Sequence, residues 1–247
     1  MFDILFARTF FIVGGMLLIT ALTARLNKAF KSAAEMIITV GGTFAFLFLV
    51  VLFAHYYPAN LILVAVFSAL VGWQIGPTIE FFGKRFKRNK FLKSRGITLN
   101  KGESLTDEQE KAFEQSFDAK SYSSEWHNVV FQALFATSCA VFATVGIVFL
   151  TSIDFSFLGS FLLIALFLLI VLGLLNLFLF RSSLFSLVRA YLGAIIFVLY
   201  LLYDFYRLKR MAGDKSWGAA IDIAVNIYLD IINLFLNLLQ LLGEASD

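Results

Sequence analysis

The stretch YLDIINLFLNLLQLLG, residues 228–243, is almost wholly aliphatic, yet it carries one aspartate, two asparagines and one glutamine. Its hydropathy is typical of a membrane-spanning helix, because about 20 apolar residues cross a hydrocarbon core of roughly 30 Å. An aspartate well inside such a helix costs about 3 kcal/mol on insertion scales. The stretch therefore predicts a membrane helix whose polar side chains face protein or water.

The whole chain has the composition of an integral membrane protein. Of its 247 residues, 60% are hydrophobic and 15% are charged, and the mean hydropathy is +0.85. Leu, Phe, Ile, Val and Ala dominate, which favours helices over a barrel made of short alternating strands. The small net charge of +3 gives no reason to expect a nucleic-acid partner. A single cysteine, Cys139, excludes an intrachain disulfide.

The apolar runs predict an all-α membrane domain that covers residues 1–247. Each run is long enough to cross the bilayer as a helix. Counts of Lys and Arg in the connecting loops conflict with one another and leave the orientation open. The seven predicted spans are residues 8–25, 36–56, 59–82, 127–150, 156–180, 186–204 and 218–242.

A polar segment at residues 83–125 interrupts the apolar pattern between the third and fourth spans. We interpret it as an extramembrane insertion that could contact a membrane-protein partner. Its basic start, GKRFKRNKFLKSR, could bind lipid headgroups, but flanking charge that fixes orientation is the simpler interpretation. Capping residues and acids followed by Phe113 and Phe117 predict a short amphipathic helix within 104–120.

The polar residues of the last span share one face. At 100° per residue, they fall within a wedge of about 80°. Lipid contact along this stripe would leave polar groups unsatisfied, so the stripe must face protein or water. The helix could lie at the periphery with its stripe inward or at the centre of the bundle. The stripe consists of Asp222, Asn226, Asp230, Asn233, Asn237 and Gln240.

The sixth span has a second polar face, formed by Arg189, Gly193, Tyr200 and Asp204. A short loop joins the last two spans, so they should pack antiparallel. If Asp204 meets Asp230, the two carboxylates cannot both ionise cheaply at low dielectric, and a shared proton would make a pH switch. Alternatively, Asp204 snorkels to the interface, and Asp230 is a buried hydrogen-bonding group. Amides in such helices often join neighbouring helices.

Three segments together resemble the transmembrane Bax inhibitor motif family. They are Tyr203-Asp204 followed by YLDIINLFLNLLQLLG, the element GWQIGP at 72–77, and ALFATSCAVF at 133–142. The chain is similar to a bacterial-type member with an enlarged third loop. The resemblance implies a seven-helix bundle with the C-terminal helix enclosed by the other six.

The resemblance also implies a pH-sensitive calcium leak channel in the membrane. Asp204 and Asp230 would share a proton, gate the path and transiently bind Ca²⁺, a hard cation that prefers oxygen ligands. The rest of the stripe on the last helix would line the pore, and no cofactor is expected. Some bacterial relatives hold the aspartates with an arginine on the second helix, where this chain offers only His55. A bacterial inner membrane is favoured, with a eukaryotic endomembrane as the alternative.

Two other functions are considered. The chain could be a non-conducting regulator that binds a protease or an apoptosis-related partner. An intramembrane aspartyl protease also places two aspartates on consecutive helices, but the residues before Asp230 lack the Gly-x-Gly-Asp that such enzymes require. We therefore do not expect an enzyme. Secondary site candidates are His55, Arg189 and Glu80, although Glu80 could simply pair with Lys84 one turn later.

Overall fold

The structure, a computed structural model, describes residues 3–96, 122–180 and 182–245. Seven of its helices are long and apolar enough to cross a membrane, and none of the described residues lies in a strand. This confirms the predicted all-α membrane architecture. The elements are α1 (Ile4–Leu26), α2 (Ala33–Leu52), α3 (Ala59–Ser94), α5 (Ser123–Leu150), α6 (Leu158–Leu175), the π-helical turn η1 (Asn176–Phe180), α7 (Ser183–Arg210) and α8 (Trp217–Ala245).

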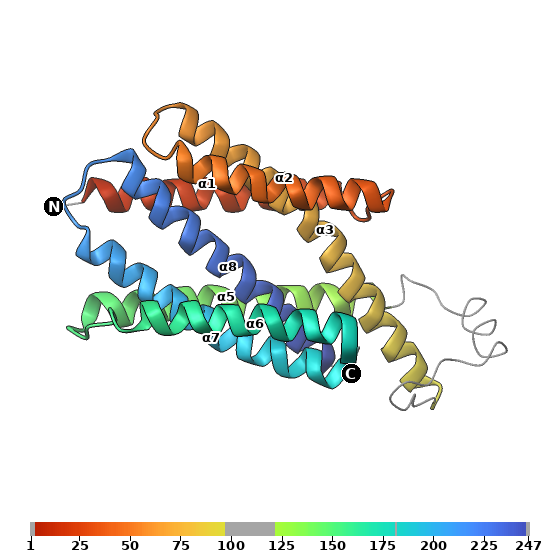
Figure 1. Cartoon of the computed structure of the whole chain (residues 1–247). Helices are drawn as coiled ribbons and strands as arrows, with labels where there is room; N and C mark the ends of the chain where they lie inside the picture. The colour runs from red at the N-terminus through yellow and green to blue at the C-terminus, as the bar shows by residue number, and fades with distance from the viewer. Residues whose placement is uncertain (1–2, 97–121, 181, 246–247) are drawn as a thin grey trace.

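The C-terminal helix α8 lies between two groups of helices (Figure 1). On one side are α1, α2 and α3, and on the other are α5, α6 and α7. Of the seven spans α8 is the most buried, and it packs mainly against α7, α1, α5 and α3. The two outer helices, α2 and α6, pack on α3 and α7 and present their apolar side chains outward. The last helix lies inside the bundle, as predicted, and its main contacts are with four of the other six helices.

Local sequence signals fix several helix ends. Ser32 caps α2: its hydroxyl accepts the Glu35 backbone N–H at 3.1 Å, while the Glu35 carboxylate accepts the Lys31 N–H at 2.7 Å. This reciprocal pair satisfies donors that the first helical turn leaves open. Pro58 lies in the turn YYPAN directly before α3, and a proline disfavours a helical conformation of the residue that precedes it. The turn lets α2 and α3 pack together as a hairpin.

Glycines in the element GWQIGP allow α1 and α3 to pack closely. A Cβ atom on Gly72 would overlap Thr23, and one on Gly76 would overlap the backbone carbonyl of Asn27. Close backbone approach of this kind is how small residues strengthen contacts between membrane helices. The α1–α3 pair in turn supports one side of α8.

The third helix is longer than its hydropathy predicts. Residues 83–94, interpreted from the sequence as the start of the extramembrane insertion, continue α3 to Ser94. Tertiary packing explains the difference, because Phe86 lies 5.6 Å from the Trp126 ring of α5 and belongs to a buried cluster with Phe235 of α8. Arg85 also pairs with Glu244 at 3.4 Å. The amphipathic helix predicted within 104–120 falls outside the described residues.

Candidate functional site

Asp204 and Asp230 meet where α7 packs against α8. Asp204 is 3% exposed and Asp230 is 6% exposed. Their carboxyl groups lie close enough to interact with each other. An ionised carboxylate only accepts hydrogen bonds, so a hydrogen bond between the two groups would require a proton on one of them. The burial of Asp204 disfavours the alternative in which its carboxylate snorkels to the interface.

The opposite face of α8 sets the orientation of Asp230. Tyr228, two residues earlier, is fully buried and its hydroxyl lies 2.6 Å from the Thr20 hydroxyl of α1. This contact fixes the rotation of α8, which turns Asp230 toward α7. One carboxyl oxygen of Asp230, Oδ2, has no hydrogen-bond partner among the described residues.

Arg207 links the buried pair to a carboxylate nearer the membrane surface. Its guanidinium donates to Asp204 Oδ1 at 3.4 Å and to Asp222 Oδ2 at 2.8 Å. The Asp204 side chain is 4% exposed, whereas that of Asp222 is 51% exposed. A connected series of ionisable groups therefore runs from the surface into the bundle, in the order Asp222, Arg207, Asp204 and Asp230. Arg207 is not among the site residues predicted from the sequence, although its spacing of three residues from Asp204 allows this contact.

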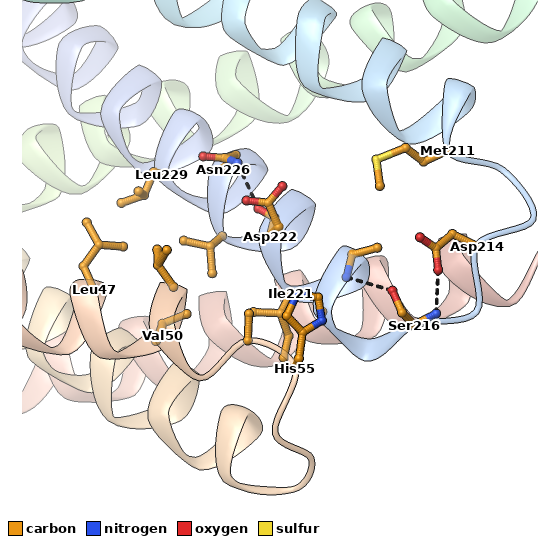
Figure 2. Close-up of a pocket in the computed structure, with 15 residues that line it drawn as sticks. Leu47, Val50, His55, Met211, Asp214, Ser216, Ile221, Asp222, Asn226 and Leu229 are labelled. Carbon is orange, nitrogen blue, oxygen red and sulfur yellow. Dashed lines mark hydrogen bonds between the residues drawn. The ribbon is translucent and has the colours of Figure 1, made fainter.

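A pocket of about 570 Å³ lies beside this series, between α2 and α8. Figure 2 shows Asp222 and Asn226 on α8, with Asp214 in the preceding loop and His55 beyond the end of α2. Hydrogen bonds from the backbone and side chain of Ser216 hold the pKa of Asp214 below its ordinary value. Two carboxylates, those of Asp214 and Asp222, therefore line the outer end of the pocket, which suits a cation.

The remaining stripe residues lie on the other side of the aspartate pair. Asn233 and Asn237 line a second pocket, of about 490 Å³, between α6, α7 and α8. Gly193 of α7 makes room for the Asn237 amide, since a Cβ atom there would lie 2.6 Å from it. Further along, Gln240 donates to Ser186 of α7 at 2.7 Å. Asp230 thus lies between two pockets along the polar edge of α8.

The amides of the stripe bond mainly within α8. The side chains of Asn226, Asn233 and Asn237 each donate to a carbonyl four residues earlier, at 2.7–2.9 Å. The interpretation of Asn233 and Asn237 as hydrogen-bonding links between helices is not supported by these contacts. Because one N–H satisfies only half of each amide's donor capacity, the stripe stays polar toward the pockets.

The secondary candidates lie apart from the pair. His55 contacts Gly218 at the start of α8, where a Cβ atom would overlap its ring, and lines the first pocket. Glu80 lines a different pocket, together with Lys28 and Lys84. Arg189 lines the second pocket beside Asn233 and Asn237. The arginine that reaches Asp204 is Arg207 of the same helix, and His55 does not take that position.

Asp154, in the loop between α5 and α6, is a second carboxylate held by α7. It accepts the Tyr206 hydroxyl at 2.6 Å and the Ser156 backbone N–H at 2.8 Å. These hydrogen bonds, that of Tyr206 foremost, lower the pKa of Asp154 to about 2. Asp154 is exposed, so it titrates independently of the buried pair.

Replacing Asp154 with Asn is expected to lower the melting temperature by a constant amount at neutral pH. The depressed pKa makes the stabilisation complete above the unfolded value of 3.8, and it is lost as pH falls through about 2. The difference in melting temperature between wild type and Asp154→Asn should therefore be constant above about pH 5 and become smaller below about pH 4. Thermal unfolding of the detergent-solubilised protein at several pH values measures it. A difference that changed near neutral pH would contradict the assignment.

Comparisons with known proteins match one family over more than half of the chain. The model of a family described as inhibitor of apoptosis-promoting Bax1 matches residues 120–247, more than half of the chain. The Golgi anti-apoptotic protein of vaccinia virus (strain Lister) is 39% identical over 120 residues, 49% of this chain and 48% of that protein. Bax inhibitor 1 of Schizosaccharomyces pombe is 28% identical over 207 residues, 82% of this chain and 60% of that protein.

A Helicobacter pylori (strain J99) protein, named only as uncharacterized, is 40% identical over 119 residues, 48% of this chain and 49% of that protein. The chain spans about half the length of most of these relatives. Neither the family description nor these names is that of an enzyme. The matched region contains α7 and α8 with both aspartates. This multi-pass membrane protein therefore belongs to the Bax inhibitor family.

Proposed function

We propose that the chain is a pH-sensitive cation leak channel whose gate is the proton shared by Asp204 and Asp230. One observation carries the proposal: the two carboxyl groups are both buried and lie close together, between two pockets on the polar edge of α8. A protonated pair keeps α7 and α8 together and closes the path. The shared proton thus joins α7 to α8, and its loss is the event that responds to pH.

Loss of the proton opens the path for an electrostatic reason. Two carboxylates in contact at low dielectric repel each other strongly, so α7 and α8 separate at this point. The same charges attract a divalent cation that prefers oxygen ligands, and Ca²⁺ fits this preference. Within the described residues no group of three or more His, Cys, Asp or Glu side chains could hold a metal. Ca²⁺ is therefore proposed as the transported ion, which Asp204 and Asp230 bind only transiently.

The proposed path follows the stripe on α8. Cations enter the first pocket past Asp222 and Asn226, where Asp214 adds negative charge. They then meet the aspartate pair and continue along Asn233 and Asn237 toward Gln240. Side-chain oxygens along this edge would replace part of the hydration shell of the ion. Relatives occur in bacteria and eukaryotes, and we propose a bacterial inner membrane as the site of action.

A second candidate is a non-conducting regulator that binds a membrane-protein partner. The basic end of α3, which projects past the predicted membrane boundary, favours this candidate, as do the apoptosis-related names of two relatives. The partner would be a protease or an apoptosis-related protein that docks at residues 83–125. The two candidates are separated by reconstituting the protein in liposomes and recording Ca²⁺ flux with an internal indicator. A channel gives Ca²⁺ flux, whereas a non-conducting regulator gives none.

Replacing residues 97–121 with a short Gly-Ser linker is expected to leave Ca²⁺ flux and its pH dependence intact. The replacement spares α3, whose Phe86 and Arg85 contact α5 and α8. A short linker suffices because Ser94 Oγ and Tyr122 Oη are 3.4 Å apart. Flux is measured in the same liposomes as the wild type. If the variant folds but loses flux while the wild type conducts, the seven helices alone do not form the channel.

A further inference from the structure

Arg189 is a membrane-embedded cation that the proposed gate does not use. It lies on α7, six residues after Ser183, and its side chain is half-buried. Among the described residues it makes no hydrogen bond, ion pair or ring contact. A guanidinium has five N–H donors, and leaving them unpaired inside a membrane protein is costly. Arg189 therefore calls for a partner that the described part of the chain does not supply.

The surroundings of Arg189 are rich in donors and poor in negative charge. Its pocket has a volume of about 490 Å³, and none of the described residues that line it is acidic. Asn176 uses its carbonyl oxygen to accept the Ser182 N–H at 3.0 Å, so its amide N–H groups remain available. Asn233 and Asn237 each retain a second amide N–H. The pocket is therefore complementary to an anion, in contrast to the acidic pocket beside Asp222.

The position of the pocket favours an anion that comes from the bilayer. The 28 residues of α7 span about 42 Å, which exceeds a 30 Å hydrocarbon core by about 12 Å, so the ends of the helix reach the headgroup level. Arg189 lies about 9 Å from the start of α7, within reach of the headgroup level for a long side chain. On the outer rim of the pocket, Ile170 is 53% exposed and Leu174 is 50% exposed. These two side chains offer an apolar surface to an acyl chain.

We infer that this pocket binds one anionic phospholipid. Its phosphate contacts Arg189 and the amides of Asn176 and Asn233, and an acyl chain lies along Ile170 and Leu174. The lipid touches α6, α7 and α8 together and fills the space between them. The site does not depend on the aspartate pair, so it stands or falls separately from the proposed channel activity.

Lipid binding to the purified full-length chain tests the site. The protein is stripped of lipid in detergent and titrated with phosphatidylglycerol or phosphatidylcholine, and bound lipids are counted by native mass spectrometry. Arg189→Gln removes the charge. Gly173→Leu fills the pocket but keeps the charge of Arg189. A Cβ atom at Gly173 would lie 3.7 Å from the Arg189 side chain, which is an ordinary contact distance. The control is Arg88→Gln, which removes an exposed cation of α3.

We expect one tightly bound phosphatidylglycerol on the wild type and on Arg88→Gln. Arg189→Gln should weaken that binding about fivefold, as expected for one arginine at an anionic headgroup, and Gly173→Leu should weaken it as well. If one variant does not fold, the other still provides the test. Equal binding of phosphatidylcholine, displacement by inorganic phosphate or free fatty acid, or an equal loss in Arg88→Gln would overturn the assignment.

Discussion

Asp230→Asn is expected to abolish the pH dependence of Ca²⁺ flux through the reconstituted protein between about pH 6 and 8. Asparagine keeps the shape of the side chain and can still donate a hydrogen bond to Asp204, so the contact between α7 and α8 survives. It cannot lose a proton in this range, so the repulsion that opens the path never develops. The variant should remain closed, with flux near that of empty liposomes at every pH.

A matched control separates the pair from other carboxylates. Asp154→Asn also replaces a carboxylate that hydrogen-bonds to α7, but its pKa of about 2 means that it stays ionised throughout this range. Its flux should follow pH as the wild type does. Flux through Asp230→Asn that rose with pH as in the wild type would rule out the shared proton as the gate.

Arg207→Gln is expected to move the midpoint of the flux curve to higher pH by about one unit. The guanidinium favours the ionised form of the pair through its contact with Asp204 at 3.4 Å, and it also holds Asp222 at 2.8 Å. Without this cation the pair keeps its proton at higher pH, so more alkaline conditions are needed for opening. Flux at pH intervals in the same liposomes gives the midpoint.

Arg210→Gln is the control for this prediction. It removes a cation from the same end of α7, where Arg210 lies over the Tyr206 ring and away from the pair. Its midpoint should stay at the wild-type value. Equal shifts in the two variants would mean that general surface charge, and not the Arg207 contact, tunes the response.

The sequence was sufficient to predict the parts of this molecule that depend on regular periodicity. Seven apolar runs predicted seven helices, because membrane helices satisfy their own backbone groups and need only length and hydropathy. The helical wheel placed Asp230 on one polar edge. Choosing the centre of the bundle over the periphery required the family resemblance, because a single polar stripe is compatible with both positions.

Features that depend on contacts between helices could not be predicted in the same way. The extension of α3 has a charged, poorly hydrophobic sequence and is held by Phe86 against Trp126 of α5. Arg207 follows Asp204 by three residues, a spacing that allows contact, but its bond to Asp222 depends on how α7 and α8 are aligned. The donor pocket around Arg189 likewise combines residues from three helices.

The most direct test of the shared proton is pH-difference infrared spectroscopy of the protein in liposomes. A protonated carboxyl group has a C=O stretching band that an ionised carboxylate lacks, so loss of the shared proton removes this band. The account predicts that the band disappears over the same pH range in which Ca²⁺ flux rises, and that Asp230→Asn shows no such change. A wild-type band that stays constant while flux changes with pH would contradict it.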